Sequence, residues 1–309
     1  MGKIKVSLIT TVLNEESSIE HFLSSVAVQS QRPDEMIVVD AGSTDKTVEI
    51  IKSFQPLIKN IKIMVKNGAN RSVGRNLAIK NAKNEIIAMS DAGCRLDKEW
   101  LKEISQPFTD KKTRVVAGFY LSGAKTVFEK CVAPFALVMP DRVNPKNFLP
   151  SARSMAIKKS VWKKTGGFPE EYSDNEDFVY AHTLRRKKIN IVFAQGAVVY
   201  WFPRKNLIQF WTMIYRFARG DAKAGLRRIK IAEIFLRYVA CVFFGLSCLV
   251  FNMLFMYFIL AIFGYFFWSI CKNYKYVKDL RAIFLLPLLQ ITSDLAVISG
   301  SVIGGLGSG

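Results

Sequence analysis

The chain has 309 residues, of which 50% are hydrophobic, and its formal net charge is +19. Its five cysteines form no CxxC pair, so the sequence supports neither a disulfide framework nor a cysteine zinc site. The positive charge alone is compatible with nucleic acid, anionic lipid or phosphorylated substrates. Long apolar runs near the end of the chain favour lipid, and we expect no nucleic-acid partner.

Strands and helices alternate in the first part of the chain. Apolar, β-rich runs predict strands at Val6–Leu13, Glu35–Val39, Ile61–Val65 and Glu85–Ser90. The segments after the first three read as helices: residues 17–29 with Ser17 or Ser18 as cap, 46–54, and a helix through Ala82 that follows a loop at Gly68–Arg75. This alternation predicts an α/β fold with a mostly parallel sheet and helices on both faces.

Polar residues follow three of these strands directly. Asn14-Glu15, Asp40 and Asp91 each come after an apolar run. In open α/β sheets ligands bind at the carboxyl ends of the strands. The sequence therefore predicts a binding site at this edge of the sheet.

The pattern is less regular between Val115 and Gly196. A strand is expected at Ser154–Ile157, and helices at Lys159–Thr165 and Glu176–Lys187. We expect this half to shape the acceptor side of one domain that spans residues 1–205.

Residues 206–237 are predicted to be helical and amphipathic. Phe210, Ile214 and Ala218 recur at near-helical spacing, with Arg216 and Arg219 interleaved. A basic helix rich in aromatic residues is typical of a membrane interface. A helix that packs in the core of the first domain is the alternative.

The region 238–309 is predicted to cross a membrane. Val239–Ile270 contains no charged side chain and exceeds the roughly 20 residues that span a bilayer. We expect three spans, at about 238–253, 254–271 and 282–304, because a hairpin returns the basic loop Lys272–Arg281 to the cytoplasm. One long tilted helix in place of the hairpin is the alternative. No signal peptide opens the sequence, so the first domain is expected on the cytoplasmic face of the cell membrane.

Two features of the last predicted span point to helix packing. Asp294 is costly in hydrocarbon and is expected to face protein, a headgroup or partner helices. Gly300-x-x-x-Gly304 permits close approach of another helix. These features are also compatible with a homo-oligomer formed through the membrane helices.

Six motifs occur in order over residues 6–187. They are Thr11-Val-Leu-Asn14-Glu15, Val38-Val-Asp40-Ala-Gly-Ser43-Thr-Asp45, Asn70-Arg-Ser-Val-Gly-Arg75-Asn76, Ser90-Asp91-Ala-Gly93, Gly166-Gly-Phe168 and Asn175-Glu176-Asp177. In order and spacing this set resembles the family 2 glycosyltransferases of the GT-A (Rossmann-like) fold. A dinucleotide oxidoreductase is disfavoured, because no GxGxxG follows the first strand.

The resemblance implies a nucleotide-sugar donor, either a UDP-sugar or a GDP-sugar. Its binding residues carry over to Thr11, Asn14, Glu15, Asp40, Gly42, Ser43, Arg71, Arg75, Asp91 and Ala92. On the residues alone, the segment from Asp40 also fits a turn followed by a capped helix. Arg75 also fits a surface arginine.

The resemblance also implies a divalent cation, Mn²⁺ or Mg²⁺, held by Asp91. Asp91 occupies the first position of the family's Asp-x-Asp motif, but Gly93 stands in the third position. A diphosphate leaving group needs its developing charge offset, by a cation on carboxylates or by cationic side chains. Asp97 is expected to cap the helix that follows it rather than to bind a metal ion.

Glu176 and Asp177 match the position of the family's catalytic base. A hydroxyl acceptor must lose its proton as it attacks the anomeric carbon, so Asp177 is predicted to be the base and Glu176 an orienting neighbour. Acidic residues are also favoured in a first helical turn. Gly167, Arg216 and Arg219 are assigned to the acceptor or diphosphate, although the two arginines equally fit cations that meet anionic lipid.

These expectations describe an inverting glycosyltransferase. It would move a sugar from a nucleotide-sugar to the hydroxyl of a membrane-associated acceptor, either a lipid or a lipid-linked molecule. The Gln-x-x-Arg-Trp signature of related processive enzymes is absent, which argues against a polysaccharide synthase. A polyprenyl-phosphate glycosyltransferase and an inactive scaffold that binds lipid or a partner are the alternatives.

Overall fold

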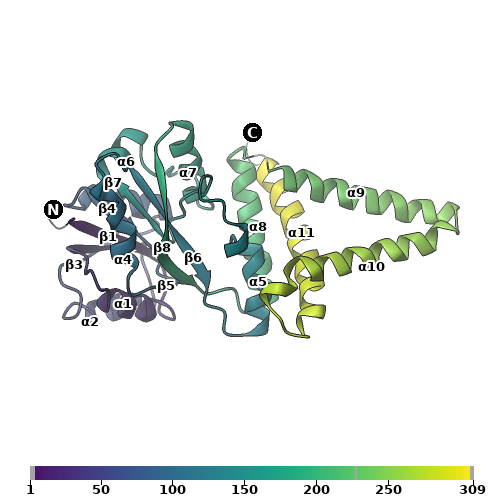
Figure 1. The fold of residues 1–309 in the computed structure, drawn as a ribbon, viewed down its shortest axis with the longest axis horizontal. Helices are drawn as coiled ribbons and strands as arrows, with labels where there is room; N and C mark the ends of the chain where they lie inside the picture. The colour runs from purple at the N-terminus through teal and green to yellow at the C-terminus, as the bar shows by residue number, and fades with distance from the viewer. Residues whose placement is uncertain (1–3, 227, 307–309) are drawn as a thin grey trace. The chain divides into compact units, whose positions relative to one another are not determined.

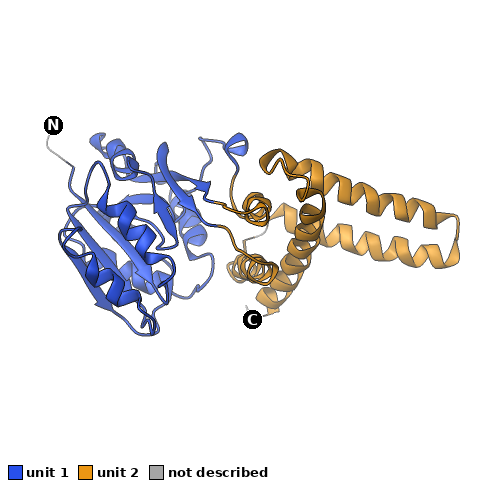
Figure 2. Cartoon of the chain, turned by 90° about the horizontal axis from the view of Figure 1, so that it is seen from below, with its two compact units in different colours: residues 1–123, 139–202 blue, residues 124–138, 203–309 orange. Residues whose placement is uncertain are grey.

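The computed structural model describes residues 4–226 and 228–306. The first and last three residues of the chain, which the sequence assigns to the first domain and the membrane region, lie outside the described residues, as does residue 227. The chain forms two compact units (Figure 2). One contains residues 1–123 and 139–202, and the other contains residues 124–138 and 203–309. Residues 124–138, expected within the domain 1–205, thus belong to the second unit.

The first unit is built on one eight-stranded mixed sheet (Figure 1). Its strands are β1 (Val6–Val12), β2 (Glu35–Asp40), β3 (Ile61–Val65), β4 (Ile86–Met89), β5 (Cys94–Leu96), β6 (Val115–Ser122), β7 (Met155–Lys158) and β8 (Ile191–Trp201). Their order is β3-β2-β1-β4-β7-β6-β8-β5. The β3-β2-β1-β4 block and the β6–β8 pair are parallel, whereas β7 and β5 pair antiparallel with their neighbours.

Helices cover both faces of this sheet (Figure 1). They are α1 (Ile19–Ala27), α2 (Thr47–Ser53), α3 (Arg71–Asn81), α4 (Trp100–Ser105), α6 (Lys159–Thr165) and α7 (Glu176–Arg186), with a short 3-10 helix η1 (Gln106–Thr109). Side chains alternate along β1, so Ile9 joins the core under α3, α6 and α7, and Leu8 points to the face that α1 and α4 cover. The mostly parallel α/β fold predicted from the sequence is confirmed.

Three local predictions were wrong in detail. α3 begins at Arg71, because Asn70 caps it by accepting the Val73 N–H at 2.9 Å, so Arg75 lies inside the helix. Ser18 occupies the N-cap position of α1, but its side chain accepts no N–H from the helix, and its hydroxyl donates to the Glu15 carboxylate. The N-cap residue of α4 is Glu99, and Asp97 Oδ1 holds the preceding turn by accepting the Glu99 N–H at 3.1 Å.

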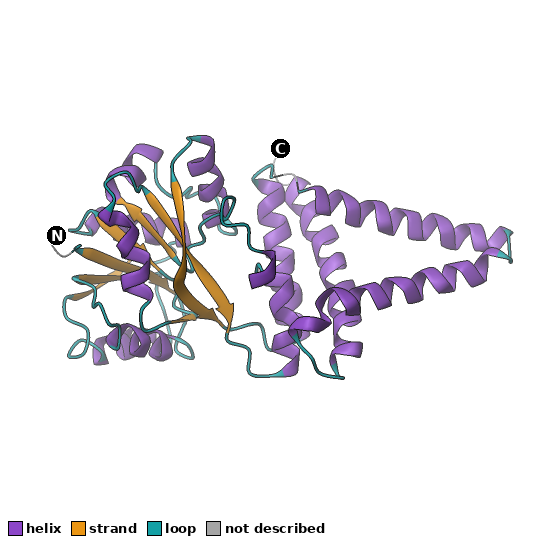
Figure 3. Cartoon of the chain, in the orientation of Figure 1, coloured by secondary structure: helices purple, strands orange, loops and turns teal. Residues whose placement is uncertain are grey.

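The second unit is helical (Figure 3). It contains α5 (Val127–Ala136), α8 (Leu207–Lys223), α9 (Ile229–Val250), α10 (Leu254–Asn273), α11 (Ala282–Leu306) and a short 3-10 helix, η3 (Tyr274–Tyr276). Three of its segments, Ile229–Val250, Leu254–Tyr276 and Ala282–Leu306, are long and apolar enough to cross a membrane. Only 6% of the apolar window is buried in each of the first two, against 44% in the third. An apolar surface of this size needs a partner other than water.

The helical, amphipathic region expected over residues 206–237 contains a break. α8 ends at Lys223, and Gly225 adopts a φ of 64°. The Leu226 N–H donates to Asp221 O at 2.9 Å and the Gly225 N–H to Ala222 O at 3.0 Å, which is the Schellman pattern of a helix end. A new helix, α9, then starts at Ile229, earlier than the span predicted from residue 238.

α8 packs closely on α11 within the second unit. The apolar residues Phe210, Ile214 and Ala218 on α8 are buried. A Cβ atom on Gly304 of α11 would lie 2.9 Å from Ala222 Cβ, so only glycine allows this approach. The close helix approach predicted from Gly300-x-x-x-Gly304 is confirmed, and α8 of the same chain provides it.

Asp294 connects the three long helices. It is 1% exposed on α11 and pairs with Arg237 of α9 at 2.5 Å. It also accepts from the Tyr265 hydroxyl of α10 at 2.7 Å and from Gln290 Nε2 at 2.9 Å. The expectation that this carboxylate faces partner helices is therefore confirmed.

Candidate active site

Two loops at the carboxyl ends of β1 and β2 are tied together by hydrogen bonds. The strand ends Val12 and Asp40 are register partners. Beyond them, the Asn14 N–H donates to Ser43 Oγ at 2.9 Å, and Asn14 Oδ1 accepts from the Thr44 N–H at 2.9 Å. Asn14 has a positive φ of 54°, which asparagine tolerates better than most residues. The predicted nucleotide residues Asn14 and Ser43 are thus in contact.

The carboxylates of Asp40 and Glu15 hold these loops. Asp40 is 2% exposed and accepts from the Gly42 N–H at 3.1 Å and from Ser43 Oγ at 2.5 Å. Glu15 accepts from the Ser18 hydroxyl. The turn that the sequence indicates after Asp40 is therefore present, and nucleotide-sugar binding by either carboxylate stays a prediction.

The other predicted nucleotide residues lie at the same edge or on α3. Thr11, near the end of β1, packs against α3, where a Cβ on Gly74 would lie 2.7 Å from Thr11 Cγ2. Arg71 is exposed as the first residue of α3. Ala92 is 2% exposed beside Asp91. All of these positions belong to the first unit.

Arg75 joins two acidic residues that are distant in the sequence. Its Nη2 lies 3.0 Å from Asp91 Oδ1, and its Nη1 lies 2.5 Å from Glu176 Oε1. The side chains of Arg75 and Glu176 are only 4% and 3% exposed. Although burial disfavours the charged form, Glu176, Asp91 and Asp177 together raise the pKa of Arg75. The surface-arginine alternative is wrong, because this side chain is a buried bridge.

Asp177 is held by a different loop from its neighbour Glu176. Asp177 Oδ2 accepts from Ser151 Oγ at 2.9 Å and from the Ala152 N–H at 3.0 Å. Burial acts to raise the pKa of Asp177, but Arg75, Arg153 and these two hydrogen bonds outweigh it and lower that pKa below its ordinary value. Asp177 is therefore ionised at neutral pH, as a proton acceptor must be.

Glu176 is shifted in the opposite direction. Burial raises its pKa above the ordinary value, and the adjacent charge of Asp177 adds to this, while Arg75 opposes it. Its carboxylate is engaged by Arg75 and has little access to solvent. This geometry suits an orienting group better than a base.

Asp91 is the carboxylate that the Asp-x-Asp position offers to a divalent cation. The Asp91 side chain is 38% exposed, with one oxygen bonded to Arg75. Gly93 provides no side-chain oxygen, and within residues 4–226 and 228–306 no three His, Cys, Asp or Glu side chains cluster as a metal site. Mg²⁺ is commonly held by one or two carboxylates together with phosphate oxygens, and Asp91 fits that donor set.

The residues predicted for the acceptor fall in both units. Gly167 has a φ of 79°, and Asn76 of α3 fixes its loop, because the Phe168 N–H donates to Asn76 Oδ1 at 2.9 Å. Arg216 is exposed on α8, and Arg219 of α8 lies 5.8 Å from the Tyr215 ring. Their roles toward an acceptor stay predictions.

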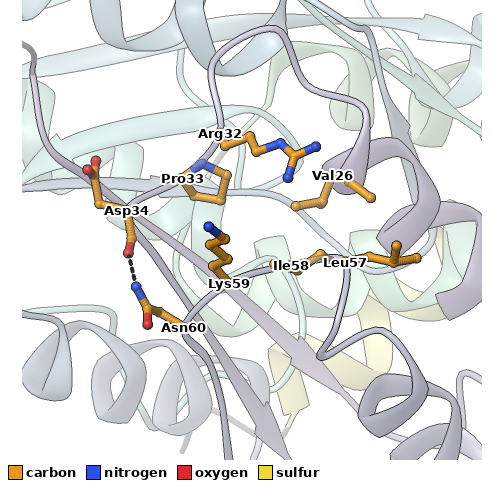
Figure 4. Close-up of a pocket in the computed structure, with 9 residues that line it drawn as sticks. Val26, Arg32, Pro33, Asp34, Leu57, Ile58, Lys59 and Asn60 are labelled. Carbon is orange, nitrogen blue, oxygen red and sulfur yellow. Dashed lines mark hydrogen bonds between the residues drawn. The ribbon is translucent and has the colours of Figure 1, made fainter.

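A separate cavity of about 260 Å³ lies at the opposite edge of the sheet (Figure 4). It is near the amino end of β2, where Asp34 accepts from Asn60 through its carbonyl at 3.0 Å. It contains none of the predicted site residues; its lining is Val26, Ala27, Arg32, Pro33, Asp34, Leu57, Ile58, Lys59 and Asn60. We therefore do not assign this cavity to the candidate active site, which lies at the carboxyl ends of the strands.

Sequence reasoning missed the loop that holds Asp177. Ser151 and Ala152 precede β7, and nothing in their spacing distinguishes them from an ordinary loop. Only the antiparallel placement of β7 beside β4 brings them to the predicted site. Their contacts are set by tertiary structure and not by a local motif.

A family model described as Glycosyl transferase family 2 matches residues 7–162, about half of the chain. The chain belongs to glycosyl transferase family 2. The glycosyltransferase AglE of Haloferax volcanii is 23% identical over 237 residues, which cover 74% of this chain and 77% of AglE.

Solved structures share the fold. The mannosyltransferase PcManGT from Pyrobaculum calidifontis, in complex with GDP-Man and Mn²⁺, matches with a TM-score of 0.59 at 15% identity over 99% of this chain and 88% of that one. Residues 1–349 of TarS from Staphylococcus aureus, in complex with UDP-GlcNAc, match with a TM-score of 0.53 at 19% identity over 98% and 92%. The sequence match to whole TarS, at 26% identity, covers 34% of its length.

The fold is thus GT-A, and the chain is a glycosyltransferase. Both were predicted from the six motifs and are confirmed. The predicted acidic residues Asp91, after β4, and Glu176, at the start of α7, meet at Arg75, and Asp177 follows Glu176 in α7.

Proposed function

We propose that this glycosyltransferase inverts the configuration at the anomeric carbon of its donor sugar in a single displacement. An acceptor hydroxyl attacks that carbon, and Asp177 takes the proton. The bond from the anomeric carbon to the diphosphate breaks, and its electron pair leaves on the diphosphate oxygen. The observation that carries the proposal is the fixed, ionised Asp177 held by Ser151 and Ala152.

The opposite environments of the two adjacent carboxylates support different roles. Glu176 is buried against Arg75, so it positions the start of α7. Asp177 is partly exposed and keeps its charge. A hydroxyl acceptor requires such a base, whereas an acceptor phosphate is already anionic and does not.

The donor is a UDP-sugar or a GDP-sugar, with its nucleotide over the loops that follow β1 and β2. Similar structures hold UDP-GlcNAc or GDP-Man, which supports a nucleotide-sugar without choosing the base. A bound Mn²⁺ or Mg²⁺ would supply positive charge to the diphosphate, and Asp91 is the residue that would hold it.

The acceptor is a lipid or a lipid-linked molecule at the surface of the cell membrane. The apolar α9, α10 and α11 support a multi-pass membrane anchor. The basic loop Lys272–Arg281 supports a cytoplasmic side for the catalytic unit, since cytoplasmic loops carry excess Lys and Arg.

Replacing Asp177 with Asn tests the proposal. The D177N variant keeps the size of the side chain but cannot take a proton, so we expect turnover of a UDP- or GDP-sugar to fall by about 10²–10⁴-fold. Affinity for the nucleoside diphosphate should stay within about twofold of the unaltered chain. Transfer that proceeds at the original rate in D177N would contradict a hydroxyl acceptor.

A further inference from the structure

Arg153 lies beside the candidate base but belongs to none of the six motifs. It follows Ser151 and Ala152, whose side-chain and backbone donors hold Asp177. The charge of Arg153 also contributes to the lowered pKa of Asp177. The guanidinium is therefore part of the electrostatic environment of the candidate active site.

Two aromatic rings hold the Arg153 side chain in place. Its guanidinium carbon lies 5.2 Å from the Trp201 ring centroid and 5.8 Å from the Tyr120 ring centroid. Trp201 on β8 is the register partner of Cys94 on β5, three residues after Asp91.

The N–H donors of Arg153 are available for a ligand. The side chain is half-buried, and across the described residues its guanidinium makes no hydrogen bond or ion pair with another side chain. A guanidinium carries five N–H donors in a fork that matches phosphate oxygens. The cation–π contacts with the two rings hold the guanidinium in position and leave these donors unused.

Arg75, another cation of the site, already has protein partners for its charge. Arg75 is in contact with both Glu176 and Asp91, so its charge is neutralised by protein carboxylates. Gly93 leaves the Asp-x-Asp position with one carboxylate to hold a cation. The departing diphosphate therefore needs further positive charge, and Arg153 directly follows the two residues that hold Asp177.

We propose that Arg153 binds the β-phosphate of the nucleotide-sugar and stabilises the diphosphate as it leaves. This rests on the proposed function. As the bond to the anomeric carbon breaks, the electron pair stays on a β-phosphate oxygen, and Arg153 donates to that phosphate. The acceptor proton goes to Asp177, so Arg153 needs to transfer none.

The test compares nucleoside diphosphates with monophosphates. Isothermal titration of the full chain in detergent with UDP, GDP, UMP and GMP, with and without Mn²⁺, gives the affinities. In R153Q we expect the affinity for the bound diphosphate to fall about 10- to 100-fold, as for the loss of a charge-assisted hydrogen bond, and monophosphate affinity to stay within about twofold. R153K should recover part of the loss, since it keeps the charge without the fork.

Arg95 provides a matched control on the same pair of strands. It stacks on the Tyr200 ring at 4.2 Å, and Arg95 and Tyr200 are register partners one residue along from Cys94 and Trp201. Successive side chains point to opposite faces, so Arg95 lies on the face away from Trp201. R95Q should leave the affinities for diphosphate and monophosphate unchanged.

Three results would overturn the assignment. An equal loss of affinity for diphosphate and monophosphate in R153Q would show that Arg153 does not act through the β-phosphate. Unchanged diphosphate affinity in R153Q would exclude Arg153 from binding the β-phosphate. If the unaltered chain binds none of the four nucleotides, the proposed function fails and this inference with it, whereas the first two results leave the proposed function standing.

Discussion

Replacing Arg75 with Met should strongly destabilise the first unit. Arg75 and Glu176 have side chains that are 4% and 3% exposed, with 2.5 Å between Nη1 and Oε1. Methionine fills much of the space but leaves Glu176 as a buried charge without a partner. Breaking a buried pair in this way costs about 3–5 kcal/mol. In a unit of this size each kcal/mol lowers the Tm by about 2–4 °C, so we expect a fall of roughly 6–20 °C.

The loss in R75M should depend on pH in a defined direction. Burial already raises the pKa of Glu176 above its unfolded value, and Arg75 is what opposes that shift. A carboxyl whose folded pKa is raised binds a proton more readily in the folded state than in the unfolded state. Stability of R75M should therefore be higher at low pH and fall as pH rises from the unfolded pKa through the raised folded pKa.

A double-mutant cycle separates the ion pair from simple loss of packing. The free energy of unfolding is measured by urea titration of R75M, E176Q and the double variant in detergent, followed by tryptophan fluorescence, to which the buried Trp100 contributes. The double variant buries no unpaired charge at position 176, so the two single losses should exceed its loss by about 2–3 kcal/mol. Strict additivity, or an R75M loss below about 1 kcal/mol, would refute the reasoning.

Three further predictions concern Asp177, Gly304 and Asp294. The acidic limb of the turnover profile should lie below about pH 4, the ordinary Asp value, because the pKa of Asp177 is lowered in the folded state; a limb near pH 6 would assign the base elsewhere. G304L should disrupt the packing of α11 on α8 and lower the Tm of the full chain in detergent, whereas G264L, where a Cβ meets nothing within 4 Å, should not. D294N removes the charge that pairs with Arg237, so protease sensitivity of the α9–α10 hairpin should rise; unchanged digestion would contradict that role.

The alternation of strands and helices could be predicted because local signals agree with the fold. β3 spans the predicted Ile61–Val65, and α6 spans the predicted Lys159–Thr165. Apolar runs bounded by polar turns are sufficient to identify such elements. The motifs at their ends also identified the acidic residues that Arg75 brings together.

Other features depend on contacts that no local signal encodes. Residues 124–138 join the second unit through packing of α5, although they lie between β6 and β7 in the sequence. The break before α9 did have a visible signal, since Gly225 is a typical residue after a helix C-terminus. The amphipathic pattern over residues 206–237 hid that signal, because α8 and α9 are both apolar on part of their surface.

The different roles of Glu176 and Asp177 follow from their position at the start of one helix. Consecutive residues of a helix project about 100° apart, so the two carboxylates must meet different surroundings. Glu176 meets Arg75 from α3, and Asp177 meets the Ser151–Ala152 loop before β7. The buried Arg75–Glu176 ion pair fixes the first turn of α7. The position of that helical turn then determines where the Asp177 side chain points. A sequence motif can therefore predict both acids, but only the packing of α3 and of the loop before β7 against α7 buries Glu176 and leaves Asp177 partly exposed.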